Sequence, residues 1–260
     1  MLVKQVANVL DILEFFAASE QPASLADVSR HFGWPRSSTF NLLSTLVSRG
    51  YLYEPEGRGR FYPTPRWLAL SQQIASVEPL PEELARLTRD LSASTGETAL
   101  VAAPSGMHAI FLNVVQSPAE VRYVAHVGDR IPLHATASGQ SILSQFPEAQ
   151  RHSLLRKVVF ERYGDGTPMS VDVVEDSIRQ SLHRGWFRSA SGYSRDLGGV
   201  SVPIVLGVRI FSLTVAGPLF RFAEKMPETA AEMHRAIGLQ FGPNFLAETV
   251  PTLASPPAMR

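Results

Sequence analysis

Apolar and polar residues alternate along the first fifty residues with the spacing of short amphipathic helices. Within residues 4–18 an apolar residue returns every three or four positions, which predicts a helix that buries one side. The apolar positions of this helix are Val6, Val9, Leu10, Leu13 and Phe16. A second helix is expected to begin at Ser24, because Ser24 and Asp27 can each bond the other's free backbone N–H. Gly33 is expected to end it.

A third helix is predicted between Pro35 and Gly50, and its two sides differ in chemistry. Proline suits the first helical position, since its missing N–H would be unpaired there. The residues expected to face inward are Phe40, Leu43 and Val47. The residues expected to face outward are Arg36, Ser37, Ser38, Asn41, Thr45 and Ser48. Short hydrogen-bonding side chains and a cation, in place of Glu and Lys, favour a helix that lies in a DNA major groove.

A hairpin with a basic turn is predicted to follow this helix. The runs Tyr51-Leu52-Tyr53 and Phe61-Tyr62 flank the turn EPEGRGR, whose Arg58 and Arg60 can reach the sugar-phosphate backbone. A capped helix and a solvated hairpin are each common without a DNA role, but their order here predicts a winged helix-turn-helix. The predicted DNA-binding residues are Ser24, Arg36, Ser37, Ser38, Thr39, Asn41, Leu42, Thr45, Arg49, Arg58 and Arg60.

The segment PRSSTFNLLSTLVSRGYLY, residues 35–53, resembles a motif of the IclR family of bacterial transcription regulators. That motif reads Pro-Lys-Ser-Thr-x-x-Arg-Leu-Leu-x-x-Leu-x-x-x-Gly-Tyr. This chain has Arg36 in place of the usual Lys, and Asn41 where an Arg is common. The second difference falls on an expected base- or phosphate-contacting position. The resemblance therefore implies a DNA-binding regulator, but it carries over no operator sequence.

A linker helix that helps two copies to pair is predicted at residues 66–78. The apolar residues at helical intervals in this segment are Trp67, Leu70, Ile74 and Val77. A lone amphipathic helix between two domains has few places to bury its apolar stripe, so a partner chain is the expected place. The alternative is a plain connector packed on its own domain. Pro79 and Pro81 mark the boundary of the second domain.

The second domain, residues 79–250, alternates helix-like and strand-like patterns in the order of an α+β fold. Helices are expected at 81–95, 138–146, 148–157, 171–184 and 227–241. Strands are expected at 98–103, 109–116, 121–127, 186–193, 200–206 and 209–216. This order predicts one antiparallel sheet, and the resemblance implies a GAF-like effector-binding domain. The first domain is expected to span residues 1–65, and residues 251–260 are expected to be a disordered tail.

The segment GDRIPLHATASGQSIL, residues 128–143, is the candidate ligand-binding motif. Ala137, Ser138 and Gly139 open a helix whose free N–H groups and positive dipole end can hold a carboxylate. The alternative is ordinary helix capping by Thr136 or Ser138. The segment resembles the Gly-x-x-x-Pro-Leu-His-x-Thr-Ala-x-Gly-Lys run at the effector pocket of IclR-type domains, with Gln140 in place of Lys.

The same resemblance implies further effector-binding positions in the segments SRDLGGVSVPI and SLTVAGP. The family tends to place a small polar residue or Cys before the Pro-containing strand, and Ser residues before Gly-Pro. The corresponding residues here are Gly199, Thr214 and Ala216. The acidic pair usual upstream of the first strand is missing, so the predicted ligand is a larger, partly aromatic or aliphatic organic acid. The complete predicted effector set is Thr136, Ala137, Ser138, Gly139, Gly199, Thr214 and Ala216.

Composition narrows the function classes. With 260 residues and a 45% hydrophobic composition, the chain can form one small and one medium domain, each with a core. There is no cysteine, which fits a reducing cytoplasm, and there is no signal-peptide pattern or apolar run of membrane-spanning length. The net charge is zero, yet six Arg and two Glu lie between Arg30 and Arg66. This region therefore carries a local basic face suited to DNA.

Catalytic and cofactor motifs are missing from the sequence. The histidines of the second domain form no i,i+4 pair and no HExxH motif: His108, His126, His134, His152, His183 and His234. A Ser–His hydrolase built on Ser138 and His134 is an alternative, but there is no G-x-S-x-G elbow, P-loop or G-x-G-x-x-G. The sequence predicts no cofactor, no metal and no catalytic residue.

The predicted function is a ligand-responsive repressor that binds a pseudo-palindromic DNA operator and a small organic acid, as a homodimer or a dimer of dimers. The alternative is an enzyme that acts on a small organic acid or ester in the same pocket.

Overall fold

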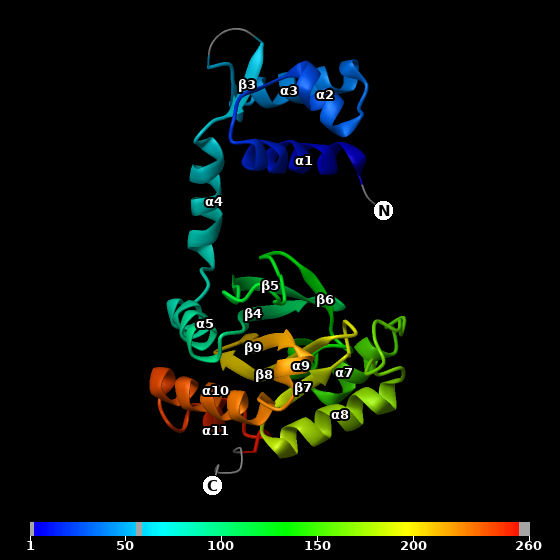
Figure 1. Cartoon of the computed structure of the whole chain (residues 1–260), viewed down its shortest axis with the longest axis vertical. Helices are drawn as coiled ribbons and strands as arrows, with labels where there is room; N and C mark the ends of the chain where they lie inside the picture. The colour runs from blue at the N-terminus through cyan, green and yellow to red at the C-terminus, as the bar shows by residue number, and fades with distance from the viewer. Residues whose placement is uncertain (1–2, 56–58, 255–260) are drawn as a thin grey trace. The chain divides into compact units, whose positions relative to one another are not determined.

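The computed structural model describes residues 3–55 and 59–254 (Figure 1). The chain divides after Pro79 into two compact units, here called the N-terminal unit and the C-terminal unit. No helix within the described residues is both long and apolar enough to cross a membrane.

The N-terminal unit has the element order of a winged helix-turn-helix. Its helices are α1 (Lys4–Ser19), α2 (Leu25–Phe32), α3 (Arg36–Ser48) and α4 (Arg66–Val77). Its strands form an antiparallel sheet in the order β1-β3-β2, with bounds β1 (Ala23–Ser24), β2 (Leu52–Tyr53) and β3 (Arg60–Pro63). The predicted capping box starts α2: the Asp27 N–H donates to Ser24 Oγ at 3.2 Å, and the Ser24 N–H donates to Asp27 Oδ2 at 3.0 Å. Gly33 ends α2 in the left-handed region, with φ of 66°.

The core of the N-terminal unit is formed by α1, α2, α3 and the small sheet. Its buried residues include Ile12, Phe16, Val28, Leu43 and Leu52. The predicted inward stripe of α1 is wrong at Val6 and Leu10, which are 60% and 54% exposed. Because Ile12 and Phe16 are about one helical turn apart and set the inward side, Val6 and Leu10 fall on other sides of the helix. Both therefore form part of an apolar outer surface.

The inward side of α3 differs from the prediction by one position. Thr39, Leu43 and Leu46 are buried, whereas Phe40 is 53% exposed. Thr39 can be buried because its hydroxyl donates to the Pro35 carbonyl at 3.1 Å, so its polar group is satisfied within the helix. A threonine thus takes the inward place that the apolar pattern assigns to Phe40.

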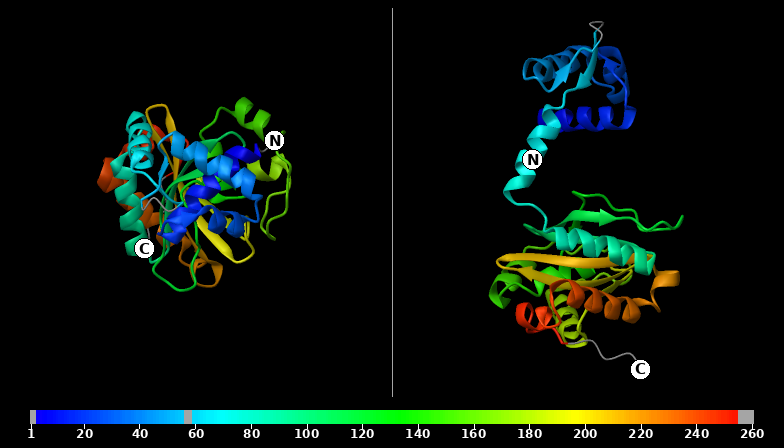
Figure 2. Two further views of the ribbon diagram at one scale, coloured as in Figure 1. Left: turned by 90° about the horizontal axis from the view of Figure 1, so that it is seen from above. Right: turned by 90° about the vertical axis from the view of Figure 1, so that its left-hand side faces the viewer.

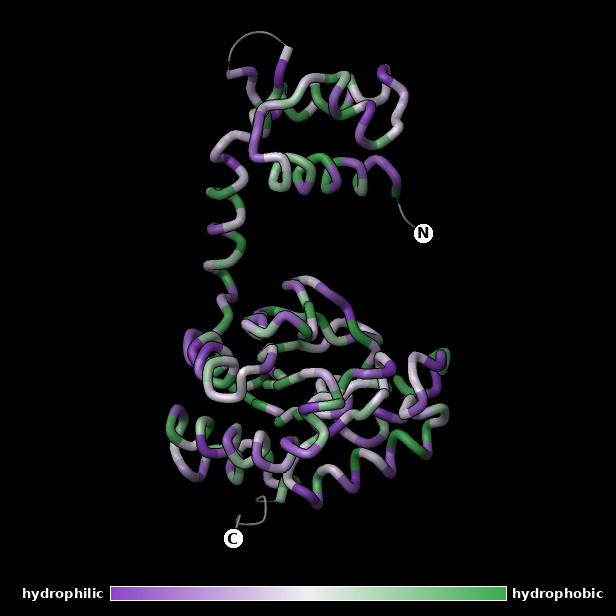
Figure 3. Tube along the Cα trace, viewed as in Figure 1, coloured by the Kyte–Doolittle hydropathy of each residue, from purple (hydrophilic) through white to green (hydrophobic). Residues whose placement is uncertain are grey.

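The first turn of α4 is anchored on the small sheet, and the apolar residues in the rest of the helix are exposed. The Trp67 Nε1 donates to the Tyr51 carbonyl at 2.9 Å, and the two rings lie 4.4 Å apart. Leu68, Ile74 and Val77 are 61%, 67% and 84% exposed, and α4 contains no buried residue. Figure 3 shows hydrophobic positions recurring along α4. The stripe predicted at residues 66–78 is therefore not buried within the N-terminal unit.

The C-terminal unit is built around one six-stranded antiparallel sheet in the order β6-β5-β4-β9-β8-β7. Its strands are β4 (Thr98–Ser105), β5 (His108–Val115), β6 (Arg130–Pro132), β7 (Phe187–Ala190), β8 (Leu197–Leu206) and β9 (Arg209–Pro218). β8 and β9 pair along their whole length and turn at Gly207, whose φ is 62°. The predicted α+β fold with an antiparallel sheet is confirmed.

Helices cover both faces of this sheet. α5 (Glu82–Thr95) and α10 (Met226–Phe241) lie side by side over one face, as the right-hand view of Figure 2 shows. Gly198 and Gly199 are neighbours in β8, and a side chain there would meet α10 and α6 (Ala137–Leu143), respectively. Because neighbouring strand residues point to opposite faces, α6 covers the other face. The remaining helices are α7 (Glu148–Leu155), α8 (Val171–Arg184), α9 (Leu219–Phe222) and α11 (Phe245–Thr249).

The strand predicted at residues 121–127 is wrong. Val121, Val124 and Val127 are 61%, 51% and 63% exposed, and the segment has no strand pairing. The short strand β6 pairs with β5 at this edge of the sheet instead. β-Branched residues favour a strand only where a neighbouring strand offers backbone partners and a face to pack against.

The predicted disordered tail also differs from the structure over residues 251–254. Leu253 is 8% exposed within the core of the C-terminal unit, and the Ala254 N–H donates to the Leu182 carbonyl at 2.9 Å. These four residues therefore belong to the fold, because they bury an apolar side chain and pair a backbone donor. Residues 255–260 lie outside the described residues.

Candidate functional site

The outer face of α3 presents a row of polar side chains to solvent. Arg36, Ser37, Ser38, Asn41 and Thr45 are all exposed. The Thr45 hydroxyl donates to the Asn41 carbonyl at 2.7 Å, so its donor is used within α3. The side chains of Ser37, Ser38 and Asn41 make no hydrogen bond to another described residue. This face therefore offers free hydroxyl and amide groups to an outside partner.

Three other residues predicted to bind DNA are directed into the N-terminal unit. Thr39 is fully buried, so the prediction that it contacts DNA is wrong. Leu42 is partly buried against the core. The Ser24 hydroxyl bonds Asp27 Oδ2 at 2.7 Å as part of the capping box, so its polar group serves the start of α2. Burial or helix capping thus explains the presence of these three residues, although their residue types alone are compatible with a DNA contact.

The predicted arginines occupy different positions. Arg49 is exposed directly after α3. The Arg60 Nε donates to the Pro22 carbonyl at 3.2 Å, so this guanidinium is fixed against the chain that precedes β1. Arg58 lies outside the described residues.

Phe40 is a surface residue that the apolar pattern does not identify. Its ring is 53% exposed on α3, one turn after Arg36 and next to Asn41. An aromatic side chain at such a position can contact the methyl group of thymine in the major groove. The residue that indicates the exposure of Phe40 is Thr39. A threonine that bonds its own helix can replace an apolar residue on the inward side.

A small cavity lies between α6 and the sheet, and we call it the sheet cavity. Six of the seven predicted effector residues line it: Thr136, Ala137, Ser138, Gly199, Thr214 and Ala216. Aromatic and aliphatic side chains form the rest of its wall, among them Phe111, Tyr123, Tyr193 and Leu197. Its volume is about 30 Å³, which is room for about two water molecules.

The hydroxyl groups of the sheet cavity form one hydrogen-bonded chain. Ser138 Oγ lies 2.6 Å from Thr214 Oγ1, Thr214 donates to Ser201 Oγ at 2.9 Å, and Ser201 donates to the Leu213 carbonyl at 3.1 Å. Thr136 caps α6 by accepting the Gly139 N–H at 2.9 Å. No charged side chain lines the cavity. It is therefore suited to a ligand with an apolar body and one or two polar groups.

Gly139 is the predicted effector residue that does not line the sheet cavity. A Cβ atom at Gly139 would lie 2.3 Å from the Leu133 carbonyl oxygen and 2.4 Å from the Leu133 Cα. The glycine therefore lets α6 pack directly on the backbone of residue 133. Its role is close packing, which the motif alone does not separate from ligand contact.

The Ser–His alternative is not formed. The Ser138 hydroxyl bonds Thr214, and His134 is buried with its ring against Phe160 at 5.1 Å. Burial lowers the pKa of His134, and its Nε2 makes no hydrogen bond to the described residues. No group of three or more acidic or histidine side chains in the described part of the chain is placed to hold a metal ion.

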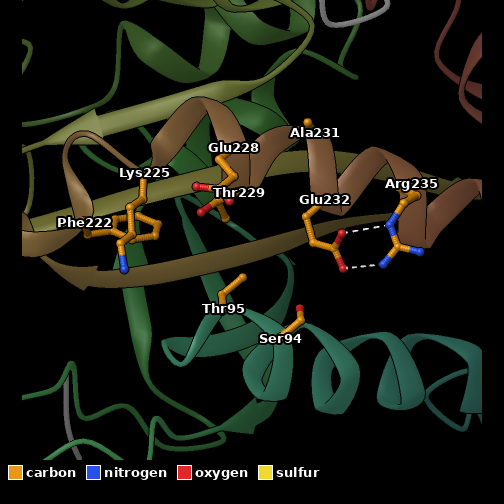
Figure 4. A pocket seen from close by; sticks show the side chains of 9 residues that line it. All are labelled: Ser94, Thr95, Phe222, Lys225, Glu228, Thr229, Ala231, Glu232 and Arg235. Atoms are coloured by element: carbon orange, nitrogen blue, oxygen red, sulfur yellow. Dashed lines mark hydrogen bonds and ion pairs between the residues drawn. The ribbon is translucent and has the colours of Figure 1, made fainter. Parts of the chain in front are cut away.

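A larger hollow of about 450 Å³ lies between the end of α5 and α10 (Figure 4). Two of its four charged side chains neutralise each other, because Arg235 donates to the Glu232 carboxylate at 2.8 and 2.7 Å. The carboxylate and the guanidinium are thus already paired, and none of the predicted effector residues lines this hollow. The sheet cavity remains the candidate ligand site.

The chain matches family models for both of its units. The model described as "IclR helix-turn-helix domain" matches residues 5–56, and "Bacterial transcriptional regulator IclR C-terminal" matches residues 72–241. The chain is 26% identical over 226 residues to the Acetate operon repressor of Salmonella typhimurium, covering 85% of this chain and 82% of that protein. It is 20% identical over 247 residues to the HTH-type transcriptional regulator XynR of Escherichia coli, covering 91% and 98%.

Two solved structures share the fold. The crystal structure of the Thermotoga maritima IclR has a TM-score of 0.73 at 19% identity, covering 92% of this chain and 99% of that chain. An IclR homologue complexed with 4-hydroxybenzoate, from Microbacterium hydrocarbonoxydans, has a TM-score of 0.68 at 22% identity, with the same coverage of both chains. Because the two family models together extend over the helix-turn-helix and most of the C-terminal unit, the chain belongs to the IclR family of bacterial transcription regulators.

Proposed function

We propose that this chain is a ligand-responsive repressor that binds a double-stranded DNA operator and carries no catalytic activity. The outward face of α3 is the observation that carries the proposal, since Ser37, Ser38 and Asn41 are exposed and free there. Serine and arginine side chains position a protein on phosphates, whereas an asparagine amide can bond the edge of an adenine in two places. Arg36, in the first turn of α3, is suited to a phosphate contact.

The repressor is proposed to act in the cytoplasm as a homodimer or as a dimer of dimers. Exposed apolar residues on α1 and α4 support pairing with a second copy: Val6, Leu10, Leu68, Ile74 and Val77. Two copies related by a twofold axis present two α3 helices to the DNA. This arrangement favours a pseudo-palindromic operator with half-sites about 34 Å apart, one helical turn of DNA.

Asn41→Ala is expected to weaken operator binding by about 1–3 kcal/mol, with the loss confined to one base position. The alanine removes the amide that reads a base edge but leaves the phosphate contacts in place. The measurement is fluorescence anisotropy with the DNA upstream of the gene and a panel of single-base-pair variants. At the position that Asn41 reads, the variant protein should bind all four base pairs with similar affinity.

Two further variants are controls for the assignment of Asn41 to a base edge. Arg36→Gln should weaken binding to every duplex and reduce the slope of log K against log salt by about one, since one phosphate contact is lost. Asn8→Ala, on α1 and not on α3, should leave operator affinity unchanged. Equal losses on operator and on random DNA for Asn41→Ala would contradict the assignment of Asn41 to a base.

The effector is proposed to be a small organic acid with an aromatic or aliphatic body, bound in the sheet cavity. The apolar wall with Phe111, Tyr123 and Tyr193, together with the absence of a charged lining side chain, supports a less polar ligand than a very small oxo-acid. The IclR homologue that was crystallised with 4-hydroxybenzoate supports the same class of ligand. Because the cavity holds only about two water molecules, binding must move wall side chains and enlarge it.

Such an enlargement gives a physical route to regulation. A ligand alters DNA affinity only through the difference between its affinities for the DNA-competent arrangement and for the other arrangement. We propose that the linker helix α4 transmits this difference, because it carries an exposed apolar stripe that a partner chain can cover.

Aromatic acids such as 4-hydroxybenzoate are expected to raise the Tm of the purified protein, and glyoxylate and pyruvate are not. Ser138→Ala should weaken aromatic-acid binding by about tenfold, since one hydrogen-bonding group of the cavity is lost. Ser144→Ala is the matched control, because its hydroxyl donates to the Ser141 carbonyl outside the cavity. Tight binding of glyoxylate or pyruvate alone would rule out this ligand class.

A further inference from the structure

A second groove in the C-terminal unit shares Ser189 of β7 with the sheet cavity, and we call it the basic groove. It is lined by α6, by α8, by the edge strand β7 and by the loop at residues 166–168, with Gln140, Ser177, Ser181, Arg184, Arg188 and Ser189 among its residues. Its volume is about 300 Å³, tenfold that of the sheet cavity and within the range of small-molecule sites. Figure 1 shows α8 beside β7 at this edge of the unit.

Arg184 is held rigidly at the end of α8. Its Nε and Nη2 donate to the Trp186 carbonyl at 3.2 and 3.0 Å, and Nη2 also donates to Ser181 Oγ at 2.9 Å. The guanidinium lies over the Trp186 ring, 4.5 Å from its centre. Its Nη1 makes no hydrogen bond to another described residue, so two N–H donors stay available at a fixed position. A guanidinium fixed in this way loses little conformational freedom when it binds an anion.

Arg188, on β7, adds a second positive charge to the same groove. Its side chain is exposed and has neither a hydrogen bond nor an acidic partner within the described residues. Burial, together with the positive charge of Arg188, lowers the pKa of Arg184 to about 10. The positive charge of Arg188 therefore disfavours the charged form of Arg184.

Within the described residues, two neighbouring arginines are each paired with a carboxylate, unlike Arg184 and Arg188. Arg151, on α7, donates to the Glu175 carboxylate at 2.8 Å, and Arg179, on α8, pairs with Asp176 at 2.9 Å. By contrast, no carboxylate among the described residues pairs with Arg184 or Arg188. The basic groove thus carries unneutralised charge beside free donors, in a hollow large enough for a ligand.

We propose that the basic groove binds a small oxyanion, a carboxylate or a phosphate, between Arg184 and Arg188. Two arginines present donors in a fixed fork geometry that matches the paired oxygens of either group. The remaining space of the groove accommodates the organic part of such an anion. The Gln140 and Ser177 side chains are already bonded to each other at 2.7 Å, so they form a polar wall instead of competing for the anion. This site is separate from the sheet cavity, although Ser189 lines both.

The test uses the full-length protein, titrated with sodium phosphate or sodium malonate against sodium chloride at constant ionic strength. Binding is measured by calorimetry, and Tm is measured in parallel. The wild type should bind at least one of the two anions, and the tighter anion identifies whether the groove prefers a phosphate or a carboxylate. No heat and no Tm difference from chloride with either anion would overturn the proposal.

Arg188→Gln supplies the discriminating variant, because the side chain is exposed and makes no bond whose loss would unfold the chain. It should weaken anion binding at least about tenfold, the effect of one charge-assisted hydrogen bond. In chloride alone it should keep or raise the wild-type Tm, since it removes the repulsion with Arg184. Arg179→Gln, a matched charge change on α8 outside the groove, should bind as the wild type does. Equal anion affinity for the wild type and Arg188→Gln would overturn the proposal.

Discussion

Gly139→Ala is expected to destabilise the C-terminal unit by about 3 kcal/mol or more, and not merely to weaken ligand binding. The added Cβ would lie 2.3 to 2.6 Å from three backbone atoms of Leu133, closer than atoms can approach. Backbone cannot yield as the end of a flexible side chain can, so α6 must move away from residue 133 or distort. Chemical denaturation followed by circular dichroism measures the loss, read from the midpoint at an unchanged m-value.

A glycine in another helix provides the control for this prediction. Gly238 lies inside α10, and a Cβ there would be 3.8 Å from its nearest neighbour, the Pro243 Cα. Gly238→Ala should therefore raise stability by about 0.5–1 kcal/mol, since alanine is the better helix former. A Gly139→Ala protein of wild-type stability that fails only to respond to a ligand would restore Gly139 to the effector site and contradict the packing role.

The sequence predicts a helix well where its capping residues and the helical spacing of its apolar residues agree. α8 begins and ends at its predicted residues, because Ser170 caps its first turn and Gly185 ends it in the left-handed region. The prediction for the inward side of α3 is wrong by one position, because a threonine bonded to its own helix replaces an apolar residue. Residues 121–127 fail for another reason: their β-branched composition favours a strand, but β6 takes the available edge.

The candidate sites divide in the same way. The motifs place six predicted residues on one cavity, since glycine and small polar residues at fixed spacing report local backbone geometry. The size of that cavity, and the packing role of Gly139, depend on segments distant in sequence. No sequence motif identifies the basic groove either. Arg184 ends a helix and Arg188 lies in a strand. Their charges have no carboxylate partner in the described part of the chain, because the neighbouring acidic residues pair with other arginines.

Glu97→Gln is expected to lower the free energy of unfolding of the C-terminal unit by about 3 kcal/mol, through an ion pair that spans 124 residues of sequence. Arg221 donates from Nε and Nη2 to the two Glu97 oxygens at 2.6 and 2.8 Å, which ties α9 to the start of β4. The Glu97 side chain is 6% exposed and Arg221 is 26% exposed. Removing the charge of Glu97 leaves a cation that water reaches only in part, so we expect the lower end of the range for buried pairs.

The reciprocal variant Arg221→Gln should cost at least as much as Glu97→Gln, because it leaves the more deeply buried partner as an unpaired carboxylate. The double variant should be less destabilised than the sum of the two single variants, since neither charge then remains uncompensated. Denaturant unfolding of all four proteins measures this coupling. Arg235→Gln, which removes an exposed partner of Glu232, is the control and should leave the midpoint unchanged. Strict additivity in the cycle would mean that Glu97 and Arg221 contribute independently, and the proposed tie between α9 and β4 would be wrong.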